Sequence, residues 1–293
     1  MKVLFIVNPR SGRRDSGNLE EIISEESRQA QFDFLIYRLQ PDTEDEEIKK
    51  EIKEYCPDIV AAVGGDGTVN YLSSLLYSTG IPLLIIPLGS ANGMAKELGI
   101  GRVDTALSLI SRGIKKNIDI LKINGKICIH LADIGLNARI VKRFEKDHKR
   151  GIITYAKYLF REIFLIKQYR FYIIEDGQEV FRKAVSLTFA NASKYGTGAI
   201  INPIGKLDDG KFEIVIIKPF PRIKLLSIAW KMFRGTLKSS QYVEVISCRD
   251  ACIKCSKKTT LQVDGEVVGK VREINIDILP GALTVIVPED WTP

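Results

Sequence analysis

The chain has 293 residues, 45% of them hydrophobic and 27% charged, with a net charge of +7; this is the composition of a globular protein with one large core or two medium ones. No apolar run approaches the roughly 20 residues of a membrane-spanning helix. The first apolar run, Val3 to Val7, is too short for a signal peptide. Because five cysteines also fit a reducing compartment better than a disulfide framework, we expect a cytoplasmic protein.

The first 110 residues alternate between apolar runs and amphipathic stretches. The predicted strands are 2–9, 32–39, 58–65 and 81–89, and the predicted helices are 19–30, 42–55, 70–78, 91–98 and 103–111. Strands that are apolar throughout, each followed by a helix, are typical of a parallel sheet covered on both faces. We therefore predict an α/β domain of three layers, Rossmann-like or flavodoxin-like.

From about Ile118 the pattern changes to short β-runs separated by Gly, Asn and Asp, and it begins with a hairpin whose turn is Asn124-Gly125. Only two helical stretches interrupt these runs. The pattern predicts an antiparallel, β-rich domain that resembles a sandwich or a flattened barrel. We place the first domain at 1–120, joined by residues 282–293, and the second at 121–281.

Basic and aromatic residues are interleaved in two stretches, Lys142 to Arg170 and Ile214 to Val243, and the second contains no acidic residue. Such stretches suit an anionic membrane surface or a nucleic acid. In the alternative interpretation, the aromatic rings belong to the core and the lysines only solvate a face. No nucleic-acid-binding module is recognisable, so we do not expect nucleic acid as a partner.

Three loops rich in Gly, Ser, Thr or Asn follow predicted strands of the first domain, at 8–17, 64–70 and 87–93. Ligands of open parallel sheets bind outside the carboxyl ends of the strands. Glycines let main-chain amides approach an anion, and the dipole of a following helix attracts it. Asp66 within such a loop makes sense when a metal ion accompanies the phosphates. Neither the P-loop nor the GxGxxG spacing is present.

The motifs along the chain resemble the diacylglycerol kinase catalytic family, which includes bacterial soluble lipid kinases and the sphingosine and ceramide kinases. They are NPRSG, GGDGTVN, PLGSANGMAKELGI, DDG at 208–210 and VDGE at 263–266. The resemblance covers nearly the whole chain in order. GGDGT is shared with NAD kinases, so the later motifs are the ones that discriminate.

The resemblance implies that ATP binds between the two domains with Mg²⁺, and that Asp66 acts with the metal and the phosphates. The implied ATP-site residues are Asn8, Pro9, Arg10, Ser11, Gly12, Thr43, Gly64, Gly65, Asp66, Gly67, Thr68, Val69, Asn70 and Ser90. Glu266 is the implied general base for the lipid hydroxyl. A hairpin turn at Asp264-Gly265 is compatible with that role, because a turn can present the carboxylate.

The resemblance further implies a structural Mg²⁺ in the second domain, held by Asp209 and by the main-chain carbonyls of Lys206 and Lys211. Asp119 is expected near the cleft. For Asp208-Asp209-Gly210 a plain acidic turn remains an alternative.

Four positions depart from the family pattern. Ser90 stands where Thr is common, and Gly93 removes a carboxylate from the third loop, which puts in doubt a metal or substrate role there. His130 and Asp133 stand where the family usually has Asn and Gly, so the lipid-facing cleft is expected to differ.

These observations predict an ATP- and Mg²⁺-dependent kinase of a lipid hydroxyl, foremost that of diacylglycerol, docked peripherally on an anionic membrane. Sphingoid and undecaprenol-type acceptors remain alternatives. An NAD kinase would need an Asn-Glu motif that we do not find downstream, and intact Asp66 and Glu266 argue against a non-catalytic regulator. The sequence leaves the oligomeric state, including a homodimer, open.

Overall fold

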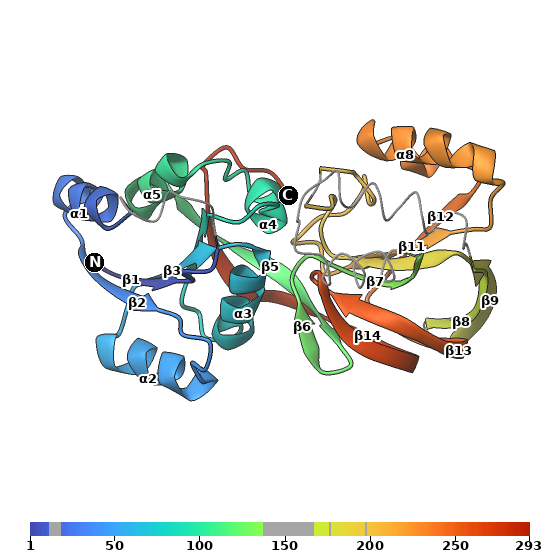
Figure 1. The fold of residues 1–293 in the computed structure, drawn as a ribbon, viewed down its shortest axis with the longest axis horizontal. Coiled ribbons are helices and arrows are strands. Elements are labelled where there is room, and N and C mark those ends of the chain that lie inside the picture. The colour runs from blue at the N-terminus through green and yellow to red at the C-terminus, as the bar shows by residue number, and fades with distance from the viewer. Residues whose placement is uncertain (12–18, 137–166, 176, 197) are drawn as a thin grey trace. The chain divides into compact units, whose positions relative to one another are not determined.

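The chain forms two compact units in a computed structural model that describes residues 1–11, 19–136, 167–175, 177–196 and 198–293. Unit 1 contains Met1–Ile118 and Gly281–Pro293, and unit 2 contains Asp119–Pro280. Figure 1 shows the elements of both units. Gly12 and most of the basic stretch 142–170 lie outside the described residues.

Unit 1 is built on a parallel sheet. Its strands are β1 (Lys2–Val7), β2 (Asp33–Arg38), β3 (Ile59–Gly64) and β4 (Leu83–Pro87), in the order β4-β3-β1-β2, and the last part of β14 (Glu266–Val287) pairs in parallel with β4. All residues of β3 and β4 are buried, as are those of β1 after Lys2. This burial explains why the strands read as continuous apolar runs.

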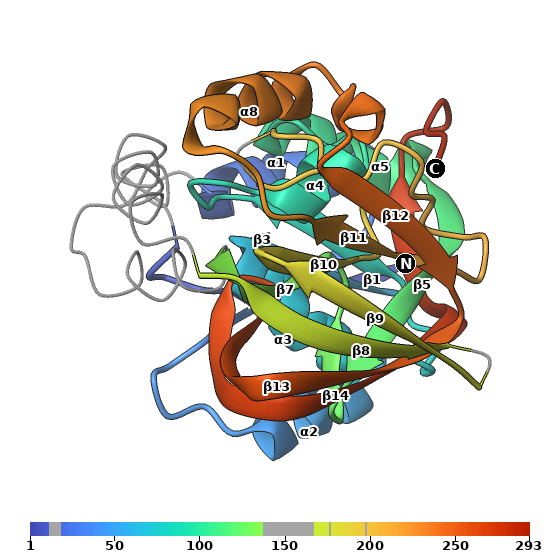
Figure 2. The ribbon, with the colours of Figure 1, turned by 90° about the vertical axis from the view of Figure 1, so that its right-hand side faces the viewer.

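Helices cover both faces of this sheet. They are α1 (Leu19–Ala30), α2 (Asp45–Tyr55), α3 (Asp66–Leu76), α4 (Gly93–Glu97) and α5 (Val103–Arg112). Figures 1 and 2 show α1 and α5 on one face and α2 and α3 on the other. The predicted three-layer α/β fold is confirmed.

The helix after β3 begins four residues earlier than predicted. α3 starts at Asp66 instead of residue 70, with Gly65 as its N-cap, and the carbonyl of Gly65 accepts the N–H groups of Thr68 and Val69 at 3.0 and 3.1 Å. Gly67 and Thr68 are weak helix formers, which is why the sequence suggested a longer loop. Their helical conformation is fixed by contacts with the two neighbouring loops, described below.

Unit 2 is an antiparallel β structure. Its strands are β5 (Ile114–Ile123, shared with unit 1), β6 (Lys126–Cys128), β7 (Leu131–Gly135), β8 (Tyr169–Glu175), β9 (Gln178–Ala184), β10 (Ser186–Ala190), β11 (Phe212–Ile217), β12 (Val243–Cys248), β13 (Asp250–Val263) and most of β14. The main path is β12-β11-β10-β7-β13-β14, and β8 joins β13 to β9 (Figure 2). The predicted β-rich, sandwich-like class is confirmed.

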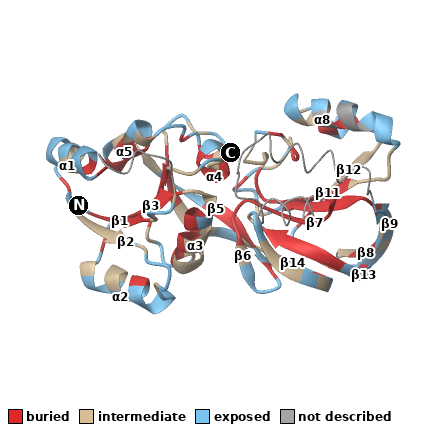
Figure 3. Cartoon of the chain, viewed as in Figure 1, coloured by how far each residue is buried: buried red, intermediate tan, exposed pale blue. Residues whose placement is uncertain are grey.

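The described residues of unit 2 form a larger and a smaller hydrophobic cluster. The larger one includes Phe171, Phe189 and Phe212, each fully buried. The smaller one lies under a helical segment formed by η2 (Arg222–Lys224), α8 (Leu225–Phe233) and η3 (Leu237–Ser239). Figure 3 shows the sheet strands largely buried while much of α8 is exposed.

Two hairpins of unit 2 have the predicted two-residue turns. Asn124 and Gly125 have φ of 48° and 84°, and Asp264 and Gly265 have φ of 45° and 89°. Positive φ at both central positions defines the type I′ turn that Asn-Gly and Asp-Gly favour.

The last two of the short β-runs expected from the sequence, at 273–279 and 282–289, belong to one strand. β14 runs from Glu266 to Val287 through Pro280 and Gly281. Pro280 and Gly281 are turn formers, so the sequence suggested a break that the chain does not make.

None of the helices in the described part of the chain is long and apolar enough to cross a membrane.

Candidate active site

Main-chain hydrogen bonds tie together the loops that follow β1, β3 and β4. The N–H of Asn8 donates to the carbonyl of Val63 at 3.0 Å, and the N–H of Leu88 donates to that of Gly64 at 2.9 Å. The described parts of the three predicted phosphate loops, at 8–11, 64–70 and 87–93, therefore lie at one edge of the unit 1 sheet, as expected for parallel strands.

Two of these loops touch through glycines. A Cβ added at Gly89 would come within 2.5 Å of the Cα of Gly65, and one added at Gly64 would come within 2.4 Å of Thr68 Oγ1. Only glycine, which has no Cβ, fits at either position. The glycines thus let the β3–α3 and β4–α4 connections approach each other at backbone distance.

Asp66 joins the same two connections. It is half-buried in the first turn of α3, and its Oδ1 accepts the N–H of Met94, in the first turn of α4, at 3.1 Å. A carboxylate is favourable at both positions, because the unsatisfied amides and the dipole of a helix N-terminus are positive. The bond leaves the second carboxylate oxygen, Oδ2, available.

Asn8 organises the first loop. Its Nδ2 donates to Thr68 Oγ1 at 3.1 Å, and its Oδ1 accepts the N–H of Arg10 at 3.0 Å. The N–H of Ser11 donates to the Asn8 carbonyl at 3.0 Å. Pro9 and Arg10 are exposed. The structure thus brings Asn8 and Thr68 into direct contact although 60 residues separate them.

The remaining predicted ATP-site residues have varied environments. Gly67 and Ser90 are exposed, and Asn70 is half-buried. Val69 is buried in the core, so only its main chain could serve a ligand. Thr43 lies after β2, where its Oγ1 accepts the N–H of Gln40 at 2.7 Å.

Glu266 is the first residue of β14, in unit 2, and is exposed. It pairs with Val263 across the type I′ turn of Asp264 and Gly265. The turn predicted from VDGE therefore presents the Glu266 carboxylate to solvent at the start of a strand.

Asp264 has a structural role that the sequence did not reveal. Its Oδ2 accepts the N–H of Ile129 at 2.8 Å, and its Oδ1 accepts those of His130 and Leu131 at 3.0 and 2.9 Å. The Cys128 thiol contacts Oδ1 at 3.2 Å. Burial, with the negative charge of Asp264 added, raises the pKa of Cys128, so the thiol stays protonated. Asp264 thus fixes the segment between β6 and β7.

Asp119 holds the DDG turn. It is 2% exposed, and its Oδ2 accepts the N–H of Gly210 at 2.7 Å. Its own N–H donates to the carbonyl of Leu207 at 2.6 Å. The acidic turn at 208–210 is therefore anchored to β5 from inside unit 2.

The predicted metal residue Asp209 is exposed, as are Lys206 and Lys211, and its Oδ1 accepts the N–H of Lys211 at 3.0 Å. Among the residues that the structure describes, no three His, Cys, Asp or Glu side chains gather as a metal cluster. The main-chain carbonyls of Lys206 and Lys211 therefore stay the predicted partners of Asp209 for a cation.

Comparison with known proteins identifies both parts of the chain. Residues 2–123 match the diacylglycerol kinase catalytic domain, and residues 131–287 match the YegS C-terminal NAD kinase beta sandwich-like domain. The chain belongs to the diacylglycerol kinase family of lipid kinases.

Individual relatives agree with this family. A diacylglycerol kinase of Bacillus subtilis is 28% identical over 72% of this chain and 72% of its own length. An uncharacterized protein of Synechocystis sp. is 29% identical over 78% of this chain, which spans only 54% of that protein. A solved candidate diacylglycerol kinase of Bacillus anthracis str. Sterne, 26% identical, superposes with a TM-score of 0.79 over 98% of this chain and 97% of its own.

One departure from the family pattern lies in the interior of this lipid kinase. Asp133, on β7, is fully buried and accepts hydrogen bonds from Thr188 at 2.5 Å, Tyr195 at 2.9 Å and Gln262 at 2.5 Å. Its side chain therefore cross-links β7, β10 and β13. His130 is also largely buried, and its Nε2 has no hydrogen-bond partner.

Proposed function

We propose that this chain transfers the γ-phosphoryl group of ATP to the hydroxyl of a membrane lipid, with diacylglycerol as the first choice of acceptor. Membership of the lipid kinase family supports the reaction class. The name of the Bacillus subtilis relative supports the acceptor.

The observation that carries the proposal is the contact between the β3–α3 and β4–α4 connections at Gly65, Gly89 and Asp66. At the start of α3, the amides of Asp66 and Gly67 have no carbonyl within the helix to bond. Phosphoryl transfer depends mainly on positioning and on neutralising charge. Main-chain N–H groups bordered by glycines can approach phosphate oxygens closely, which suits positioning.

The negative charge of Asp66 helps to neutralise charge in phosphoryl transfer only when a cation accompanies the nucleotide. Its available Oδ2 is the kind of hard oxygen ligand that Mg²⁺ prefers. Asp66 would hold the cation, which would supply neutralisation of the charge that develops during phosphoryl transfer. In this proposal Asp66 orients the bound nucleotide and remains tied to α4 through Oδ1.

Glu266 is the proposed general base. Its exposed carboxylate takes the proton of the lipid hydroxyl while the hydroxyl oxygen bonds to the γ-phosphorus, and the bond between that phosphorus and the β–γ bridging oxygen breaks to release ADP. The type I′ turn and the first pair of β14 restrict where this carboxylate can reach.

A lipid panel with γ-labelled ATP and Mg²⁺ tests the proposal. We expect label in diacylglycerol presented in mixed micelles, less in sphingosine or undecaprenol, and none in NAD. The Glu266→Gln variant should bind ATP normally but give no labelled lipid above background. Label in NAD alone, or an unchanged rate for Glu266→Gln, would overturn the acceptor or the base respectively.

A further inference from the structure

Three large apolar side chains of the segment 222–238 are exposed. Ile223 is 83% exposed, Trp230 63% and Phe233 57%, which are the three highest values among the exposed large hydrophobic residues of the described chain. Trp230 and Phe233 are three residues apart on α8, so they share one side of the helix.

The opposite side of α8 is anchored. Ile228 is buried, and Met232, four residues later, packs against the smaller core cluster of unit 2, which also contains Leu237. One side of the helix therefore packs on unit 2, and Trp230 and Phe233 lie on the side away from that contact. The core interpretation of this basic stretch therefore applies to Ile228 and Leu237 but not to Trp230 and Phe233.

The charged residues of the segment that carries these rings are all basic. The segment from Ile214 to Val243 has no Asp or Glu. Lys224, Arg234 and Lys238 of the same segment are exposed. The guanidinium of Arg234 lies over the Trp230 ring, 4.8 Å from its centroid, in a cation–π contact. We call Ile223, Lys224, Trp230, Phe233, Arg234 and Lys238 the α8 face.

We propose that the α8 face docks on an anionic lipid bilayer. Aromatic and aliphatic side chains that project among basic ones match the boundary between acyl chains and anionic headgroups. The inference deepens the proposed function, since a kinase with a bilayer-embedded acceptor must reach the membrane surface. It gives unit 2 a means of doing so that does not involve the phosphate loops.

The charge pattern disfavours a second copy of the chain as the occupant. In a twofold dimer the same patch meets itself, so Lys224, Arg234 and Lys238 would oppose their own copies. Three apolar side chains also supply little of the roughly 800 Å² per partner that a stable interface buries.

Vesicle cosedimentation without ATP or acceptor lipid tests docking directly. We expect binding to vesicles of equal phosphatidylglycerol and phosphatidylcholine, and little binding to pure phosphatidylcholine. Because each basic side chain near such a surface adds about fivefold to the affinity, the Lys224→Glu/Lys238→Glu variant should bind at least about 20-fold more weakly. The matched control Lys257→Glu/Lys258→Glu changes two exposed lysines of β13 and should bind like the wild type.

The apolar contribution is tested by Trp230→Ala/Phe233→Ala, which should lose about tenfold or more in vesicle affinity with little change in thermal stability. Its control is Phe181→Ala, because Phe181 is 43% exposed on β9 against Tyr172. Equal losses in this control and in the α8 variant would overturn the assignment of the α8 face.

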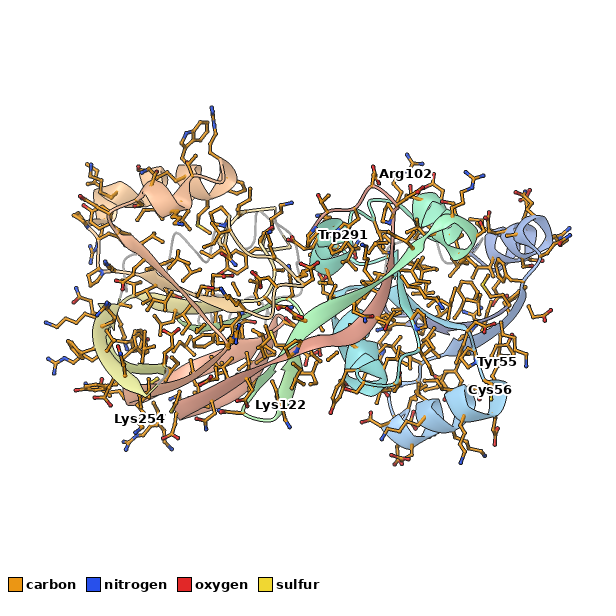
Figure 4. All side chains as sticks on the ribbon, turned by 180° about the vertical axis from the view of Figure 1, so that it is seen from behind. Tyr55, Cys56, Arg102, Lys122, Lys254 and Trp291 are labelled. Carbon is orange, nitrogen blue, oxygen red and sulfur yellow. The ribbon has the colours of Figure 1, made fainter. Side chains whose placement is uncertain are left out.

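Fluorescence separates the bilayer from a second copy. The chain has two tryptophans, and Trp291, in unit 1, donates its Nε1–H to the carbonyl of Glu97 at 3.0 Å (Figure 4). Trp291→Phe leaves Trp230 as the reporter. We expect a blue shift with anionic vesicles and quenching by brominated lipid. A blue shift that follows protein concentration without lipid, or a spectrum unchanged by vesicles, would refute the proposal.

Activity on a short-chain diacylglycerol dispersed in detergent distinguishes this inference from the proposed function. The Lys224→Glu/Lys238→Glu variant should keep the wild-type rate there and lose activity only on vesicles. If the wild type binds vesicles but phosphorylates no lipid, the proposed function fails and the docking face stands.

Discussion

The Asp66 carboxylate accepts the main-chain N–H of Met94 at 3.1 Å, so the first residue of α3 also holds the first turn of α4. The same side chain is the proposed partner of the nucleotide and its cation. Its structural role needs one oxygen acceptor, and its chemical role needs a negative charge. An amide supplies the first and not the second, so the two roles can be measured separately.

Asp66→Asn should therefore lose activity and keep stability. Its Oδ1 can still accept the Met94 N–H, while removal of the charge should lower the transfer rate by about 100-fold or more. Asp66→Ala should lose as much activity and also about 1 kcal/mol of unfolding free energy. Urea denaturation and the labelled-ATP assay give the two quantities. A wild-type rate for Asp66→Asn would remove Asp66 from the reaction.

Gly89→Ala should damage nucleotide binding by separating the two loop connections. The added Cβ would lie 2.5 Å from the Cα of Gly65, so backbone must move at a cost of about 1–3 kcal/mol. Calorimetric titration with ATP and thermal unfolding should both show the loss. Gly101→Ala is the control, because a Cβ at Gly101 meets nothing within 4 Å. If the two variants bind ATP equally, the close approach is not needed for binding.

The two acids of VDGE should give opposite phenotypes. Asp264 accepts three main-chain N–H groups, and Asp264→Asn tolerates the positive φ of this position but loses the charge, so we expect a stability loss of about 1–3 kcal/mol. Glu266 is exposed, and Glu266→Gln should change stability by less than about 0.5 kcal/mol while abolishing turnover. Denaturation curves and rates for both variants check this; a matched loss of stability in Glu266→Gln would contradict it.

The contributions of Glu213, on β11, and Glu244, on β12, to the free energy of unfolding should change in opposite directions as the pH rises. Burial, together with the charge of Asp209, raises the pKa of Glu213 above its ordinary value of 4.5. The hydrogen bonds from Asn202 and Ser247 act in the opposite direction and only partly offset this rise. The folded state therefore favours the protonated form. The contribution of Glu213 to stability falls as the pH rises from 4.5 through the raised pKa.

Glu244 behaves in the reverse way. Hydrogen bonds from Arg182, and then from Lys218, lower the pKa of Glu244 below 4.5. Its contribution to the free energy of unfolding is therefore complete above pH 4.5 and is lost as the pH falls through the lowered pKa. Urea unfolding from about pH 3 to about pH 7 should show that Glu244→Gln costs most at the neutral end. Glu213→Gln should gain stability relative to the wild type as the pH rises. Parallel pH profiles for the two variants would refute these assignments.

The sequence predicted well those features that depend on local pattern. The buried strands β1, β3 and β4 are apolar throughout, and a chain that alternates them with helices has few alternatives to a parallel sheet. Asn124-Gly125 and Asp264-Gly265 form type I′ turns because their residues tolerate positive φ. The motif resemblance then assigned the loops at the ends of these strands to the candidate ATP site.

Features that depend on distant contacts were missed. The amides that Asp264 binds lie 133 to 135 residues earlier in the chain, and nothing local in VDGE indicates them. The early start of α3 likewise requires the contact of Thr68 with Asn8 and that of Asp66 with Met94. An Asp-Gly turn signal was present at Asp264, but it revealed the backbone conformation and not the use of the side chain.

The hydrogen bonds that Asp264 accepts from three consecutive main-chain N–H groups should restrict the local opening of that segment. The stretch from Ile129 to Leu131 has bends at its first two residues and no ladder partner there, yet each of its N–H groups is occupied by one carboxylate. Such amides exchange with solvent only when the Asp264 turn itself opens. A segment that looks like a loop should thus show the hydrogen-exchange protection of a strand, and its opening rate would report how firmly Glu266 is held.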